Sequence, residues 1–148
     1  MNILFDSSVL IAAFVEAHPK HKSALSALTK AKNKEFELFV SAHTILEIYS
    51  VLTSAPFKPK ITPVIAKQLI ENNIKPFAKI VYLSDKDYFT IVDKMSSSGL
   101  IGGIAYDAII IKCALNSKVD KILTLNSKDF LRLTNVLSTK PRYKIVSL

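Results

Sequence analysis

Short apolar runs alternate along this chain with longer segments in which apolar residues recur every three or four positions. The short runs predict buried strands, and the longer spacing predicts amphipathic helices. Because strands and helices alternate, we expect an α/β fold with a central, mainly parallel sheet of four or five strands flanked by helices. The predicted strands are 3–5, 37–40, 79–83, 121–125 and 144–146.

Helix start signals lie between these strands. Thr62 followed by Pro63 is typical of an N-cap and a first-turn proline. The other candidate caps are Ser7 or Ser8, Ser41 and Ser84. Helices are predicted over 9–14, 20–34, 42–53, 63–73, 85–98 and 104–115, and a short one after Asn126. We see no internal repeat or linker, so we expect one domain over residues 1–148.

The composition is that of a folded protein in a reducing compartment. Apolar residues make up 49% of the chain, which is enough for a sizeable core. The lone cysteine, Cys113, provides neither a disulfide framework nor a zinc cluster and is expected in the core. No apolar run approaches the roughly 20 residues of a membrane span, and the first residues lack a signal-peptide pattern. We therefore expect a cytoplasmic protein with no membrane contact.

The charge balance favours a polyanionic partner such as nucleic acid. The net charge is +8, and Arg132 and Arg142 are the only arginines among 20 Lys and Arg residues. Such a surface suits contact with phosphates more than bidentate readout of bases. For any single lysine, the sequence favours a solvated surface over a phosphate contact. The best candidate for phosphate contact is the basic face of the 20–34 helix, formed by Lys20, Lys22, Lys30, Lys32 and Lys34.

Three of the 12 acidic residues interrupt apolar segments, namely Asp6, Glu47 and Asp107. Asp6 follows the first predicted strand, and the polar residues Thr124, Asn126 and Asp129 are grouped in the same way at the end of the 121–125 strand. In a parallel sheet both groups lie at the carboxyl edge, where open α/β folds bind ligands. Acidic residues also cap helices or occupy first turns without any catalytic role, so a structural reading of Asp6 and Asp107 stays open.

Carboxylates that converge at one edge repel each other unless a cation lies between them. Oxygen ligands without His or Cys favour magnesium or manganese over zinc, and His18, His21 and His43 have no metal-ligand spacing. In the absence of the ion, repulsion and burial should raise the pKa of at least one of these carboxyl groups above its unfolded value.

Other folds with an Asp after the first strand are disfavoured. A phosphatase with an Asp nucleophile usually needs a second Asp at position 8, which is Ser8. A receiver domain needs an acidic pair just before Asp6, and a dinucleotide-binding fold needs a glycine-rich first turn; the chain has neither.

Four motifs, in order, resemble the PIN domain, and in particular the VapC-like toxins of type II toxin–antitoxin modules. They are the apolar-Asp6-Ser7-Ser8 start, the mid-helix Glu47, the helix that contains Asp107-Ala108-Ile109-Ile110, and the element 124–130. The resemblance covers essentially the whole chain. It implies an α/β/α sandwich and a ribonuclease that hydrolyses RNA phosphodiester bonds with one or two Mg²⁺ or Mn²⁺ ions. By position it implies catalytic roles for Asp6, Glu47, Asp107, Asn126 and Asp129, the first three as metal ligands.

The resemblance also implies supporting roles and partners. Ser7 or Ser8 and Thr124 match hydroxyls that orient the carboxylates, whereas Asn126 stands where the family commonly has Asp. This departure leaves open whether Asp129 supplies the missing charge or only caps its helix. A homodimer and a cognate antitoxin are expected, with the 63–73 helix, which carries Ile65, Leu69 and Ile70, as a candidate surface for either. The alternative is a PIN-like RNA-binding or assembly protein without catalysis, against which the three retained acidic residues argue.

Overall fold

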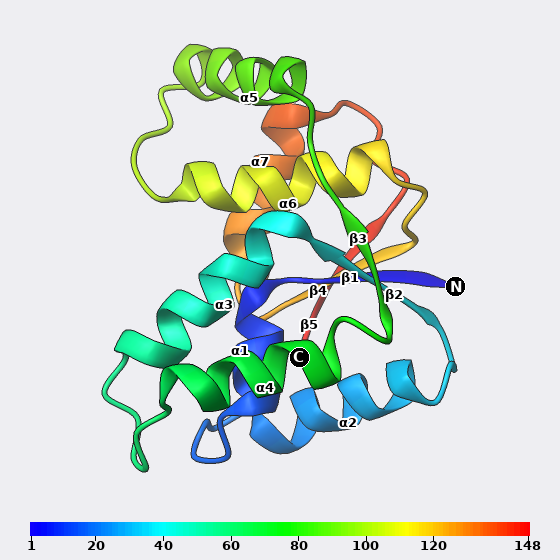
Figure 1. The fold of residues 1–148 in the computed structure, drawn as a ribbon. Helices are drawn as coiled ribbons and strands as arrows, with labels where there is room; N and C mark the ends of the chain where they lie inside the picture. The colour runs from blue at the N-terminus through cyan, green and yellow to red at the C-terminus, as the bar shows by residue number, and fades with distance from the viewer.

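Five parallel strands form the central sheet of the computed structural model, which describes residues 1–148 (Figure 1). They are β1 (Asn2–Phe5), β2 (Glu37–Ser41), β3 (Ala78–Val81), β4 (Lys121–Thr124) and β5 (Lys144–Ser147), in the spatial order β3-β2-β1-β4-β5. The predicted parallel α/β fold is confirmed, and every predicted strand is present. Because β1 is central, the residue that follows it is surrounded by the ends of other strands.

Helices cover both faces of the sheet and divide the core into two clusters. Side chains alternate along β1, so that Ile3 and Phe5 belong to one cluster and Leu4 to the other. The first cluster is covered by α1 (Ser7–Phe14), α2 (His21–Lys32), α3 (Ala42–Ser54) and α4 (Pro63–Asn73). The second is covered by α5 (Asp85–Ser97), α6 (Ile104–Asn116) and α7 (Ser127–Leu137), on the opposite side of the sheet in Figure 1.

Two of the expected helix caps differ in the structure. Asp6, not Ser7 or Ser8, caps α1, since its Oδ1 accepts a hydrogen bond from the Ser7 N–H. Ser41 precedes α3, but its buried hydroxyl has no hydrogen-bond partner. The Thr62 and Ser84 caps are confirmed. The structural reading of Asp6 is therefore correct as far as it goes, and any catalytic role must be added to the cap.

The last helix is longer than predicted. α7 has 11 residues, whereas the sequence pattern indicated a short helix after Asn126. Phe130 and Leu133 of α7 are fully buried in the second cluster, and this packing extends the helix beyond its polar first turn.

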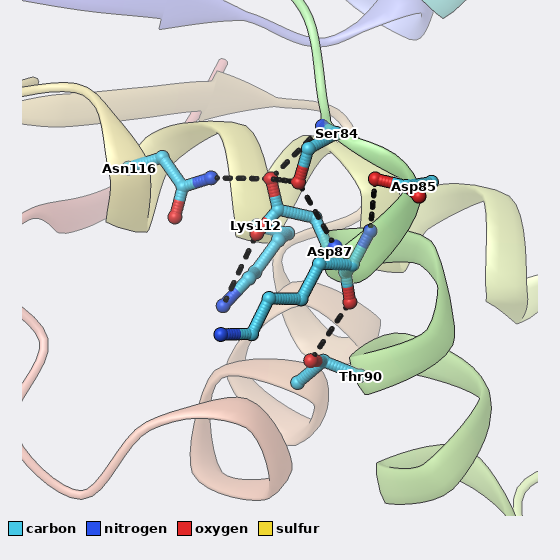
Figure 2. A network of polar contacts seen from close by, with 7 residues as sticks. Ser84, Asp85, Asp87, Thr90, Lys112 and Asn116 are labelled. Atoms are coloured by element: carbon cyan, nitrogen blue, oxygen red, sulfur yellow. Dashed lines mark hydrogen bonds and ion pairs between the residues drawn. The ribbon is translucent and has the colours of Figure 1, made fainter.

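A polar cluster at Asp87 fixes α5 against the carboxyl-terminal end of α6 (Figure 2). The Asp87 carboxylate accepts hydrogen bonds from the Ser84 N–H at 3.0 Å and the Asn116 amide at 3.0 Å, and Lys112 lies 3.9 Å away. The Ser84 N–H contributes most to holding the pKa of Asp87 below its usual value. These contacts help to orient α6, whose first turn carries Asp107.

Two smaller expectations are also resolved. Cys113 is buried in the second cluster, and burial raises the pKa of its thiol to about 11. None of the helices combines the length and the apolar character that crossing a bilayer would require.

Candidate active site

The register of the two central strands brings Asp6 and Thr124 together. Phe5 of β1 pairs with Leu123 of β4, so the next residue of each strand lies at the same carboxyl edge. The Asp6 N–H donates to the Leu123 carbonyl at 3.0 Å, and the Thr124 hydroxyl donates to Asp6 Oδ2 at 3.0 Å. The predicted convergence of these two strand ends is thus present in the structure.

Four donors surround the Asp6 carboxylate, which is only 3% exposed. Oδ1 accepts from the Ser7 N–H at 2.8 Å and the Ser7 hydroxyl at 3.3 Å, and Oδ2 accepts from the Ser8 hydroxyl at 2.6 Å and from Thr124. A buried carboxylate needs such partners to remain charged. Ser7, Ser8 and Thr124, all three hydroxyls in the sequence prediction, therefore contact Asp6.

Two of these hydroxyls have a fixed direction. The Ser8 hydroxyl accepts from the Leu125 N–H at 3.1 Å, and the Thr124 hydroxyl accepts from the Asn126 N–H at 3.0 Å. Because each oxygen already accepts a backbone hydrogen, its own proton is directed to Asp6. The Asp6 carboxylate is therefore held as an acceptor in one orientation before any ligand arrives.

Asp107 is the acidic residue of the site whose pKa is raised. It is half-buried in the first turn of α6, and desolvation together with the charges of Asp6, Glu47 and Asp129 raises its pKa to about 7. No hydrogen bond is among the causes, so nothing offsets the repulsion. This agrees with the expectation that at least one of the carboxyl groups has a raised pKa, and it places four acidic residues in one electrostatic field.

Glu47 is more exposed than the apolar pattern of its helix suggests. One third of its side chain is accessible (33%), and Oε2 lies 3.6 Å from His43 Nε2, one turn earlier on α3. The His43 ring in turn stacks on Tyr106, with 5.3 Å between centroids and 4° between planes. The stack therefore joins the segment that carries Glu47 to the one that carries Asp107.

Asn126 and Asp129 act as a pair at the start of α7. Asn126 is the N-cap residue, but its side chain does not cap the helix; its amide donates to Asp129 Oδ2 at 2.8 Å. Asp129 also contributes to the raised pKa of Asp107. The Asn126 amide therefore orients the Asp129 carboxylate, whose charge acts on Asp107.

The donor chemistry of this edge suits a hard divalent cation. All of the convergent donors are oxygens, as Mg²⁺ and Mn²⁺ prefer. No three acidic, His or Cys side chains are already arranged around one common point. Asp6, Asp107 and Glu47 are the side chains that would hold such an ion.

The predicted lysine face is only partly grouped. Lys20 and Lys22 are exposed at the start of α2, whereas Lys30 and Lys34 lie near its end, where the chain leads to the amino-terminal edge of the sheet. Lys32 Nζ donates to the Asn73 side chain at 2.9 Å and lies 5.1 Å from the centre of the Phe77 ring. The structure thus gives Lys32 a packing role between α2 and the end of α4.

Sequence reasoning missed Tyr106 as a site residue. It precedes Asp107 and is 58% exposed, yet its ring stacks against His43. An exposed aromatic residue next to a candidate ligand was the available signal, but its stacking partner lies on another helix and is not visible in the sequence.

Comparisons with known proteins agree with the fold. The model of the PIN domain family matches residues 3–136. Ribonuclease VapC40 of Mycobacterium tuberculosis is 30% identical over 105 residues, which cover 71% of this chain and 72% of that protein.

Solved structures of low sequence identity share the architecture. VapC20 of Mycobacterium tuberculosis, described as a sarcin–ricin loop cleaving toxin, has a TM-score of 0.69 at 10% identity and covers 88% of this chain and 94% of its own. VapBC2 of Rickettsia felis, solved with a promoter DNA fragment, has a TM-score of 0.63 at 17% identity and covers 100% of this chain and 99% of its own.

Proposed function

This chain belongs to the PIN domain family, and we propose that it is a metal-dependent ribonuclease that acts as the toxin of a toxin–antitoxin pair. The observation that carries the proposal is the Asp6 carboxylate, held by four donors at the carboxyl edge of the sheet, together with Asp107, whose pKa is raised by desolvation and by the charges of Asp6, Glu47 and Asp129. A fold that keeps this repulsion at the ligand-binding edge of its sheet has a site suited to a cation. The similarity to Ribonuclease VapC40 supports RNA as the substrate.

Each acidic residue has a distinct role in this proposal. Asp6, held by four donors, would be the fixed ligand, and Asp107 and Glu47 would complete the ligand set. Asp129, which accepts a hydrogen bond from the Asn126 amide, adds negative charge that acts on Asp107. When bound, the ion would supply Lewis acidity toward a phosphodiester oxygen and a lowered pKa for an attacking water.

Proton release accompanies binding of the ion. With a pKa of about 7, Asp107 is partly protonated at neutral pH and must lose that proton to act as a ligand. The site is therefore expected to bind its metal more tightly as the pH rises through 7. No side chain of the site is required as a nucleophile.

An apolar groove between α3 and α4 is the proposed seat of the antitoxin. It has a volume of about 660 Å³, and the residues that line it include Leu46, Tyr49, Val64, Ile70 and Ile80. Val64 and Leu46 are 65% and 73% exposed, which is unusual for a surface left in water. Of the three α4 residues expected there, Ile70 lines the groove, Leu69 packs against the core and Ile65 is exposed. An apolar helix of the antitoxin fits such a groove.

The homodimer remains a proposal that rests on a second apolar surface. Phe89 and Val92 project from α5 on the other side of the sheet and are 73% and 64% exposed. Because this surface is separate from the α3–α4 groove, a second copy and an antitoxin could be bound together. Light scattering that finds a monomer at micromolar concentration would contradict the dimer.

The deciding experiment is cleavage of a labelled RNA library in the presence of Mg²⁺, Mn²⁺ or a chelator. We expect cleavage with either ion, none with the chelator, and none with the Asp6→Asn variant. RNA binding without cleavage under all conditions would instead support the non-catalytic RNA-binding alternative. Cleavage by Asp6→Asn equal to wild type would contradict a site centred on Asp6.

A further inference from the structure

A stacked pair of rings lies next to the acidic site without being part of it. His43 comes from α3 and Tyr106 from the first turn of α6, and their rings are nearly parallel, 4° apart with 5.3 Å between centroids. The His43 side chain is 29% exposed and Tyr106 is 58% exposed. The separation of the centroids shows that the two rings are offset, and Tyr106 remains largely exposed beside His43.

Each ring adjoins a carboxylate of the site. His43 Nε2 is 3.6 Å from Glu47 Oε2, and Tyr106 is bonded through the backbone to Asp107. Glu47 and Asp107 also interact electrostatically, because the charge of Glu47 raises the pKa of Asp107. The ring pair is therefore held at a short distance from the place where a phosphodiester would react.

The rings also form one side of a pocket of about 340 Å³. Its other lining residues are Leu46, Glu47, Ser50 and Val51 of α3. The pocket therefore combines a flat aromatic wall, aliphatic side chains and one carboxylate. Its volume lies at the lower end of the range of small-ligand sites, which begins at about 300 Å³.

We propose that Tyr106, backed by His43, is a stacking platform for an unpaired RNA base next to the scissile phosphodiester. This inference rests on the proposed ribonuclease function of the same site. A phosphodiester placed against Asp6 and Asp107 carries its neighbouring nucleotide past the start of α6, where Tyr106 is exposed. Unpaired bases are commonly held by stacking on aromatic side chains, and every base offers a face for it. Tyr106 is thus a positioning residue that selects for single-stranded RNA.

The test compares Tyr106→Ala, Tyr106→Phe and the control Tyr88→Ala. Tyr88 is 45% exposed in the first turn of α5, whose Asp87 contacts Asn116 at the far end of α6. Asn116 lies about 15 Å along α6 from Tyr106. Tyr88, the neighbour of Asp87, is therefore near the opposite end of that helix. The probe is a mixed-sequence single-stranded RNA 12-mer, some copies of which carry the fluorescent base 2-aminopurine. Affinity, KM, kcat and 2-aminopurine quenching are measured with Mn²⁺, and urea unfolding checks that each variant is folded.

We expect Tyr106→Ala to weaken RNA binding about 5- to 150-fold, the range for loss of one base stack, mainly through KM and with loss of quenching. Tyr106→Phe and Tyr88→Ala should remain within about twofold of wild type. Unchanged affinity and quenching in Tyr106→Ala would overturn the platform while leaving the ribonuclease proposal intact, provided that Asp6→Asn is still inactive. If the wild-type protein does not cleave RNA, the proposed ribonuclease function is refuted, and the stacking platform is refuted with it.

A protein partner at the same rings gives a different result. If Tyr106→Ala changed the oligomeric state measured by light scattering but not RNA affinity, the rings would belong to a protein interface, and the platform would be refuted.

Discussion

The Thr124 hydroxyl donates a 3.0 Å hydrogen bond to the Asp6 carboxylate across 118 positions of sequence. The same hydroxyl accepts a hydrogen bond from the Asn126 N–H, so it links Asp6 to the turn that carries Asn126 and Asp129. Thr124 is fully buried. One small side chain therefore sets the direction of the central carboxylate and the position of the turn beside it.

We expect Thr124→Val to lower both stability and activity. Valine keeps the shape but removes the buried donor to Asp6 and leaves the partly buried Asn126 N–H without its acceptor. Such a loss costs about 1–3 kcal/mol of unfolding free energy, measurable by urea titration in a chelator. Thr124→Ser keeps the hydroxyl and should retain most of both properties. Equal stability of the valine variant and wild type would mean that this hydrogen bond contributes little.

Asn substitutions at Asp6 and Asp107 should both abolish metal-dependent cleavage but should change metal-free stability in opposite directions. Asp107→Asn removes a charge that its neighbours repel, so the metal-free variant should be at least as stable as wild type at pH 8. Asp6→Asn places an NH₂ group among four donors, so that variant should be less stable. Thermal unfolding with and without Mg²⁺ checks both, and Mg²⁺ should stabilise wild type more than either variant. Cleavage that survives in Asp107→Asn would show that this residue is not a required ligand.

The contribution of Asp107 to the stability of the metal-free protein should fall as the pH rises from about 4 to about 7. Asp107 has a folded pKa of about 7 against a usual value of 3.8, so between these values the native state binds more protons than the unfolded state. The contribution of this group is therefore complete below its unfolded pKa and is lost as the pH rises through 7. Urea unfolding of wild type and Asp107→Asn in a chelator isolates this term, which the variant should lack. Parallel pH profiles for the two proteins would contradict the raised pKa.

Asn126→Asp should strengthen metal binding at the expense of metal-free stability. The substitution replaces an amide donor to Asp129 by a second carboxylate beside it and adds to the field that acts on Asp107. We expect a lower dissociation constant for Mn²⁺ by calorimetry and a lower melting temperature in a chelator. Asn126→Ser, which also loses the amide but adds no charge, is the matched control. If both variants bind Mn²⁺ equally, the charge at position 126 does not reach the ion.

RNA affinity should depend on the two ends of α2 unequally. Lys20 and Lys22 start the helix, whereas Lys30 and Lys34 lie near the amino-terminal edge of the sheet, opposite Asp6. Replacing the first pair with Gln should therefore reduce the salt dependence of RNA binding more than replacing the second. Each lost phosphate contact should lower the slope by about 0.7 for single strands. Equal slopes for wild type and both double variants would mean that the lysines form only a solvated surface.

The sequence by itself determined the order of elements and the parallel sheet, and it singled out the acidic residues of the candidate site. Apolar periodicity is a local signal that can be read directly from the sequence. Parallel strands have their carboxyl ends at one edge of the sheet, independently of the conformation of the loops. Asp6 and Thr124 could therefore be assigned to one edge before their contact was known. The sequence also indicated that repulsion would raise at least one pKa, but not which group would be affected.

Only the tertiary structure decided how these residues meet. That Asp107 carries the raised pKa follows from its partial burial without a hydrogen bond, whereas Asp6 is satisfied by four donors. The exposure of Glu47, the length of α7 and the stacking of His43 on Tyr106 depend on how α3, α6 and α7 pack. Such contacts join residues far apart in the chain, and a local pattern of apolar and polar positions contains no record of the distance between them.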